Sequence, residues 1–155
     1  MAGPLKSGSV KSQANLSKKK IAIIVAEWNE EITEALYEGA VSGLINNGVK
    51  KENIVRKNVP GTFELSLGAK WMANKKEIVA VICLGCVIQG DTPHFNYICQ
   101  AVAYGITEVG LKSEKPTIFG VLTTLNKQQA IDRAGGKYGN KGEEAALTAI
   151  QMLNF

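Results

Sequence analysis

The longest apolar segment of the chain, Ile78–Ile88, restricts the possible fold more than any other feature. It contains no charged residue and is rich in valine and isoleucine. Such a continuous run predicts a strand covered on both faces, as in a parallel sheet between helices. The turn Gln89–Pro93 and a helical pattern follow directly. A strand, a turn and a helix start leave backbone N–H groups free, so this corner is a candidate anion site.

Three shorter segments are predicted as further strands: the apolar run Ile21–Ala26, Ile54–Val59, which Pro60-Gly61 ends, and Thr117–Thr123 after Pro116. A helical pattern follows each of the four strands. This alternation predicts a three-layer α/β/α sandwich with a four-stranded parallel sheet, the arrangement called flavodoxin-like. Five helices are expected. The first runs from the N-cap Asn29 to Gly48, the second carries Phe63, Leu67 and Trp71, and the third has the apolar face Phe95, Ile98, Val102, Ile106 and Val109. The last two cover Asn126–Arg133 and Gly142–Leu153.

Ligands of such sheets bind at the carboxyl ends of the strands. Four segments of this sequence should meet there, although they are far apart along the chain. They are Trp28-Asn29, Pro60–Glu64, the corner at residues 85–95, and Phe119 with Thr123-Thr124.

Charge and hydropathy indicate one domain preceded by a basic arm. Residues 1–17 are rich in Ser, Gly, Lys and Asn and predict a flexible arm, which can add a strand to a neighbouring subunit, and residues 18–155 form the domain. The net charge of +4 arises in the first 20 residues, which hold five lysines and no acid, so no basic face for nucleic acid is expected. Without a run of about 20 apolar residues or a signal-peptide core, we expect a cytoplasmic protein with no membrane partner.

Several site classes are excluded by spacing. Cys83 and Cys86 form a CxxC pattern inside a predicted strand, where residues three apart point to opposite faces, so buried cysteines are expected instead of a redox pair. One histidine and no second cysteine pair argue against zinc. Gly135–Gly142 resembles a phosphate loop, but Asn140 precedes the lysine, Gly142 follows it, and the segment follows a helix. No GxGxxG supports a dinucleotide fold.

The remaining candidates each have two readings. His94, the only histidine, is either a surface or capping residue or a group that transfers protons near neutral pH. Asp91 or Thr92 can cap the following helix with Pro93 as its first residue, which is compatible with anion binding. Trp28 either covers the core edge or stacks on a planar ring. Glu64 either complements a helix dipole or accepts hydrogen bonds from hydroxyl groups. Arg133 either complements a helix dipole or binds a phosphate.

Taken together, five ordered segments resemble the lumazine synthase family over about residues 21–154. They are Glu27-Trp28-Asn29, Val59–Leu65, Leu84–Phe95, Phe119–Thr124, and Arg133–Gly136 with Gly139–Gly142. Members of this family carry out the penultimate step of riboflavin biosynthesis. They condense 5-amino-6-(D-ribitylamino)uracil with 3,4-dihydroxy-2-butanone 4-phosphate to give 6,7-dimethyl-8-ribityllumazine, phosphate and water. The resemblance implies a transferase that uses no metal and no cofactor.

The resemblance also implies roles for matching residues. His94 matches the proton-transfer residue, and Arg133 the residue that binds the phosphate. Asp91 and Thr92 match the phosphate-side turn. The pyrimidine substrate would contact Trp28, Thr62, Phe63, Glu64, Cys86, Val87, Ile88, Phe119 and Lys141.

Three positions depart from the family pattern. Trp28 stands where phenylalanine is commoner, Gln89 where a basic residue is frequent, and Asp91 places an acid beside the phosphate turn. If Asp91 contributes, its backbone N–H must face the phosphate, with the carboxylate turned away.

The family forms pentamers whose active sites lie between neighbours, with Phe119, Arg133 and Lys141 reaching in from the adjacent chain. Some pentamers assemble into an icosahedral capsid, a 60-mer, and the short segment Gly135–Gly142 favours that shell. The alternatives are an archaeal-type riboflavin synthase, against which the intact segment from Arg133 argues, and a non-catalytic flavin-binding or shell-forming relative.

Overall fold

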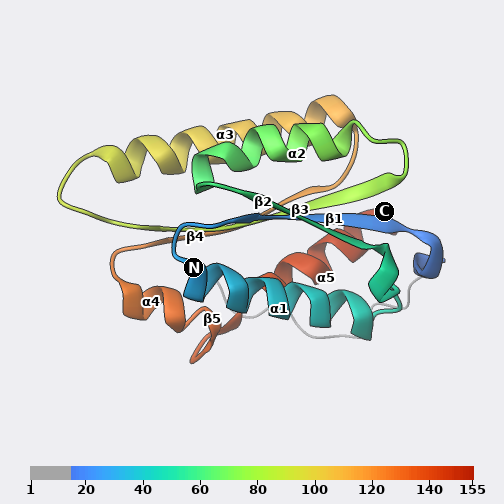
Figure 1. Ribbon diagram of the computed structural model, residues 1–155, viewed down its shortest axis with the longest axis horizontal. Coiled ribbons are helices and arrows are strands. Elements are labelled where there is room, and N and C mark those ends of the chain that lie inside the picture. The colour runs from blue at the N-terminus through green and yellow to red at the C-terminus, as the bar shows by residue number, and fades with distance from the viewer. Residues whose placement is uncertain (1–14) are drawn as a thin grey trace.

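The computed structural model describes residues 15–155, and the predicted sheet is confirmed (Figure 1). Its strands are β1 (Lys20–Ala26), β2 (Ile54–Val59), β3 (Ile78–Ile88) and β4 (Thr117–Thr124). They run parallel in the order β2-β1-β3-β4, so that β2 and β4 are the edge strands. This order puts the most apolar strand, β3, in the interior of the sheet.

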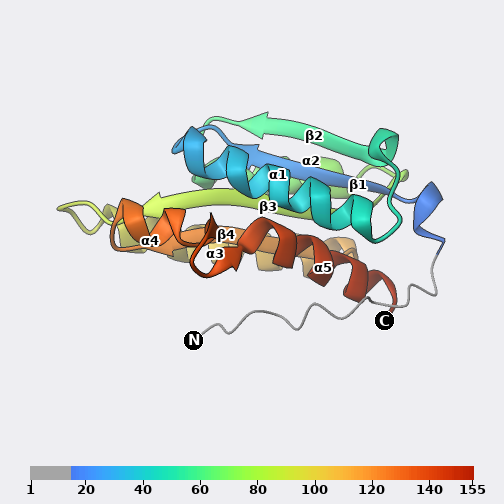
Figure 2. The ribbon, with the colours of Figure 1, turned by 90° about the horizontal axis from the view of Figure 1, so that it is seen from below.

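Helices cover both faces of the sheet and complete the predicted α/β/α sandwich. The helices α2 (Leu65–Ala73) and α3 (His94–Ser113) lie on one face. On the other face lie α1 (Glu30–Asn46), α4 (Lys127–Ile131) and α5 (Lys141–Leu153), with α1 and α5 side by side (Figure 2). None of the helices in residues 15–155 is long and apolar enough to cross a membrane.

The two faces of the sheet have separate apolar cores. Cys86 packs in the core under α1 and α5, and Cys83 in the core under α2 and α3. The two thiols therefore lie on opposite faces, as the strand period predicts, and both are free. Burial raises the pKa of the Cys83 thiol to about 12 and that of Cys86 to about 11, so both stay protonated at neutral pH.

The predicted helix starts need correction. Asn29 occupies the N-cap position of α1 but has a left-handed backbone (φ 60°), and its side chain caps nothing. Its amide instead donates to the Cys86 carbonyl at 2.9 Å, which ties the end of β1 to the end of β3. At α3, Pro93 is the N-cap residue and His94 the first helical residue, and neither Asp91 nor Thr92 caps the helix.

The helix expected to carry Phe63, Leu67 and Trp71 is split in two. A short 3₁₀ helix, Thr62–Glu64, precedes α2, and all three of these apolar side chains are exposed. The buried side of α2 consists instead of Leu65, Gly68, Ala69, Met72 and Ala73.

The glycine-rich segment between α4 and α5 is a small hairpin. Its strands are β5 (Ala134–Gly136) and β6 (Gly139–Asn140), which pair antiparallel. Gly135 and Gly139 have φ angles of 110° and 77°, which only glycine adopts readily. Three 3₁₀ turns complete the elements: Leu16–Lys18, Lys51–Asn53 and Thr62–Glu64.

The arm expected over residues 1–17 lies mostly outside the described residues. Of the part that is described, Leu16 is buried in the core under α1 and α5. The Asn53 amide donates to the Ser17 carbonyl at 2.7 Å. Residues 16 and 17 are thus fastened to the domain.

Candidate functional site

A cleft of about 590 Å³ opens at the carboxyl ends of β1 and β3, beside the turn that follows β2. Eight of the predicted site residues line it. They are Trp28, Thr62, Phe63, Glu64, Cys86, Val87, Ile88 and His94. Three of the four segments expected at the carboxyl edge of the sheet therefore converge in this cleft, whereas the fourth, Phe119 with Thr123-Thr124, does not line it.

Backbone hydrogen bonds fix the walls of this cleft. The Glu27 N–H donates to the Val59 carbonyl at 2.9 Å, and the Trp28 N–H donates to the Pro60 carbonyl at 3.3 Å. The end of β1 is thus fastened to the turn after β2. Trp28 is 74% exposed, so its indole forms an open flat wall. A side chain at Gly61 would come within 3.0 Å of a Glu64 carboxylate oxygen, so glycine at this position leaves room for that carboxylate in the cleft wall.

The corner after β3 offers backbone donors next to His94. In the described part of the chain, the N–H groups of Gly90, Asp91 and Thr92 have no hydrogen-bond acceptor. His94 is exposed at the start of α3 and lines the cleft. Asp91 and Thr92 are exposed on the turn and line neither pocket described here. The corner can therefore receive an anion at the edge of the cleft.

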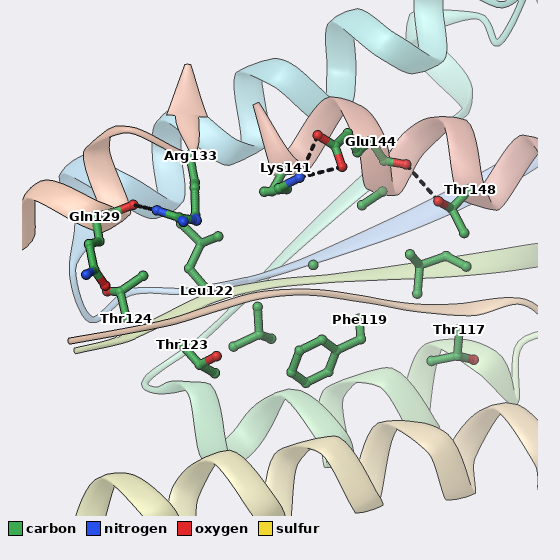
Figure 3. Close-up of a pocket in the computed structure, with 14 residues that line it drawn as sticks. Thr117, Phe119, Leu122, Thr123, Thr124, Gln129, Arg133, Lys141, Glu144 and Thr148 are labelled. Carbon is green, nitrogen blue, oxygen red and sulfur yellow. Dashed lines mark hydrogen bonds and ion pairs between the residues drawn. The ribbon is translucent and has the colours of Figure 1, made fainter. Parts of the chain in front are cut away.

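A second pocket, of about 540 Å³, surrounds the edge strand β4 and contains the other three predicted residues. Figure 3 shows Arg133 and Lys141 on one side of β4, and Phe119 and Thr123 on the other. Arg133 follows α4, and Lys141 begins α5. The hairpin joins them, because the Lys141 N–H donates to the Arg133 carbonyl at 2.9 Å.

The two cations in this pocket are held differently. The Lys141 ammonium lies 2.7 Å from both oxygens of Glu144, and each side chain is only 18% exposed, so its charge is already paired. The Arg133 guanidinium donates from Nη1 to the Gln129 carbonyl at 2.9 Å and forms no ion pair within residues 15–155. Arg133 therefore carries the unpaired positive charge of this pocket.

The two pockets have no lining residue in common. In one chain, the structure gathers Trp28, Glu64 and His94 in the cleft but places Phe119, Arg133 and Lys141 elsewhere. The sequence placed Asn29 at this edge and as an N-cap but did not mark it as a site residue, and it gave no role to the lining residues Gln129, Glu144 and Thr148. The spacing of Glu144 three residues after Lys141, on a predicted helix, was an available signal. No group of three metal-binding side chains occurs in the described residues.

Comparison with known proteins agrees with the resemblance in the sequence. The family model described as 6,7-dimethyl-8-ribityllumazine synthase matches residues 18–155. A relative of that name from Cytophaga hutchinsonii is 70% identical over 139 residues, which cover 90% of this chain and 87% of the relative. Relatives of the same name from Parabacteroides distasonis and Porphyromonas gingivalis are 60% and 54% identical, covering 93% and 88% of this chain and 90% and 84% of their own.

Proposed function

The chain belongs to the 6,7-dimethyl-8-ribityllumazine synthase family, and from this membership we propose that each of its active sites is assembled from two neighbouring copies of the chain. The reaction is that of the family. The enzyme is a transferase of riboflavin biosynthesis that condenses 5-amino-6-(D-ribitylamino)uracil with 3,4-dihydroxy-2-butanone 4-phosphate. Nothing in the comparisons supports the non-catalytic alternative.

The observation that supports a shared site is the separation of the two pockets. The cleft supplies His94 and the pyrimidine wall but lacks a free cation among its lining residues. The pocket at β4 supplies the unpaired Arg133 and the exposed ring of Phe119 but has no histidine. A phosphorylated substrate needs both, so the β4 pocket of one copy faces the cleft of the next. When each copy contacts the next in this head-to-tail way, the copies can close into a ring with cyclic symmetry. We propose that this ring is a pentamer, as in the family.

The cleft residues hold the pyrimidine substrate. Trp28 stacks on its ring, with Thr62 and Phe63 beside it, and Glu64 accepts hydrogen bonds from the ribityl hydroxyls. The backbone of Cys86, Val87 and Ile88 borders the ring edge. Phe119 and Lys141 of the neighbouring copy close the pocket over the ring.

The chemistry then needs only positioning and proton transfer. The 5-amino group of the pyrimidine attacks the ketone carbon and loses water to form an imine. Phosphate is then eliminated as a neighbouring C–H proton is removed, and the resulting enol becomes a carbonyl. The ribitylamino nitrogen attacks this carbonyl and loses a second water, which closes the ring. His94 lines the cleft, and its imidazole can both accept and donate the protons that move in these steps. Arg133 of the neighbour and the N–H groups around Asp91 and Thr92 neutralise the phosphate as it leaves.

The first test is direct. The purified protein is mixed with both substrates, and formation of the lumazine is followed by its fluorescence. We expect Arg133→Ala to lower kcat/KM by about a thousandfold, because it removes the charge partner of the phosphate. His94→Ala should cost less, because water can partly replace a proton carrier. Absence of product above the uncatalysed background, or a larger loss in His94→Ala, contradicts these roles.

The second test concerns the shared site. His94→Ala and Arg133→Ala chains are co-expressed so that they mix in one assembly. If each site takes its histidine and arginine from different chains, about a quarter of the sites regain both residues, and activity returns above that of either variant. A mixture no more active than its two components would rule out a site built across subunits.

A further inference from the structure

This inference rests on the proposed role of Arg133 in binding phosphate. We propose that Tyr138, at the turn of the β5–β6 hairpin, is a positioning residue that holds the Arg133 guanidinium ready for the phosphate group. Sequence reasoning assigned no role to Tyr138. The hairpin connects Arg133 to Lys141 along the chain and lies next to α4 (Figure 1).

Two contacts hold the guanidinium. Its Cζ lies 4.9 Å from the centroid of the Tyr138 ring, which is within range for a cation–π interaction. Its Nη1 donates to the Gln129 carbonyl at 2.9 Å. The Tyr138 ring therefore covers one face of the guanidinium. The Gln129 carbonyl of α4 accepts a hydrogen bond from one of the five guanidinium N–H groups.

These contacts leave the charge and most of the donors of Arg133 free. Asp132, the residue before Arg133, accepts from Gln128 at 2.9 Å, and Glu144, which lines the same pocket, is paired with Lys141. A phosphate binds a guanidinium along its edge, in the plane, whereas the aromatic ring contacts its face. Stacking on Tyr138 is therefore compatible with a bidentate phosphate contact.

The hairpin fixes the ring relative to the arginine. The Tyr138 N–H donates to the Asp132 carbonyl at 2.7 Å, and the Lys141 N–H donates to the Arg133 carbonyl at 2.9 Å. The two bonds anchor the hairpin on the carbonyls on either side of the Arg133 Cα. Lys137 Nζ also lies 5.3 Å from the ring centroid, so the hairpin adds positive charge near the pocket. An arginine ordered in advance loses less conformational freedom on binding, which strengthens phosphate binding.

Three variants of Tyr138 separate the effect of the aromatic ring from that of side-chain volume. Tyr138→Phe keeps the ring, and Tyr138→Leu keeps apolar volume without it. We expect Tyr138→Leu to raise the KM for the butanone phosphate, and the inhibition constant of inorganic phosphate, by about two- to fivefold. The KM for the pyrimidine should stay unchanged. Tyr138→Phe should keep both phosphate constants close to those of the unchanged protein, and Tyr138→Trp should match or improve them.

Arg133→Ala distinguishes this inference from the proposed function. In that background, Tyr138→Leu should change nothing further, because the ring acts through the arginine. If Arg133→Ala itself leaves phosphate inhibition unchanged, the proposed phosphate role fails. Suppose instead that Arg133→Ala weakens phosphate inhibition. Then only the role of Tyr138 fails if Tyr138→Leu leaves inhibition unchanged, weakens it equally with and without Arg133, or raises the KM values of both substrates alike. Thermal unfolding and light scattering check fold and assembly, and the Tyr138→Trp comparison tests the role if Tyr138→Leu does not fold.

Discussion

At the scale of single residues, Arg56 and Glu34 illustrate how a charged pair secures an edge strand. Arg56 lies on β2, and its Nη1 donates to a Glu34 oxygen of α1 at 2.9 Å. The guanidinium also stacks over Tyr37, 4.3 Å from the ring centroid. The hydrogen bond from Arg56 lowers the pKa of the Glu34 carboxyl below its ordinary value of 4.5, against an opposing effect of burial. The pair thus fastens β2 to the helix beneath it.

Glu34→Gln tests this pair through pH. A carboxyl whose pKa is lowered by folding adds stability above its unfolded pKa and loses it as the pH falls through the folded value. The two side chains are 39% and 30% exposed, so solvent screens the pair. We expect the variant to lower the free energy of unfolding at pH 7 by about 0.2–1 kcal/mol, with the difference vanishing in strongly acidic buffer. Urea unfolding at both pH values measures it.

Glu38→Gln, one turn further along α1, is the matched control, because Glu38 is exposed and forms no ion pair in the described residues. An equal loss in both variants, or a loss from Glu34→Gln that does not change with pH, would show that the pair does not stabilise β2.

At the scale of elements, α1 and α5 approach closely because small residues meet between them. A side chain at Gly43 of α1 would lie 3.0 Å from the Ala146 Cβ of α5, and one at Gly142 would overlap the Leu36 carbonyl oxygen. Asn140, the N-cap of α5, donates to the Ala35 carbonyl of α1 at 2.9 Å. This contact sets where α5 begins, and with it the place of Lys141 in the β4 pocket.

Gly142→Ala therefore should destabilise the protein by about 1–3 kcal/mol, because the added methyl group forces the two helices apart. Gly110→Ala is its matched control in α3, where the new methyl group would meet Thr117 at 3.4 Å, an ordinary contact. That change should stabilise by up to about 1 kcal/mol through helix propensity. Denaturant midpoints measure both. Equal effects of the two substitutions would mean that close helix packing does not depend on Gly142.

At the scale of the whole molecule, the layer formed by α2 and α3 exposes six large apolar side chains. They are Phe63, Leu67 and Trp71 at or on α2, and Tyr97, Tyr104 and Leu111 on α3. Phe63 also lines the cleft, so this apolar layer is continuous with the proposed site. Burial of the layer between copies is consistent with the pentamer proposed above.

The proposed assembly has a measurable size. The hairpin between α4 and α5 is short, with strands of three and two residues, and adds no bulky insertion at that position. We therefore expect pentamers to associate further into an icosahedral shell of about sixty copies. Light scattering of the purified protein measures the particle mass. A particle no larger than a pentamer would leave the shared site possible but would contradict the shell.

The order of elements and most of the cleft were predictable from the sequence. The bounds expected for β2 and β3 agree with the structure, and those for β1 and β4 differ by one residue at one end. These predictions succeeded because β-branched apolar segments and the turn residues that bound them are local signals. The convergence of Trp28, Glu64 and His94 followed from one further rule, that parallel strands share a carboxyl edge.

The sequence by itself therefore determined the layered fold, the carboxyl edge at which the cleft opens and, through five ordered motifs, the family. Only the tertiary structure decided that Asn29 ties β1 to β3, that Phe63, Leu67 and Trp71 face outwards, and that Tyr138 stacks on Arg133. The structure also places Arg133 and Lys141 in a different pocket from His94, which local patterns did not predict and only the family resemblance implied. The physical reason is range: periodicity records which side of an element is apolar, whereas these contacts join residues through the relative placement of whole elements.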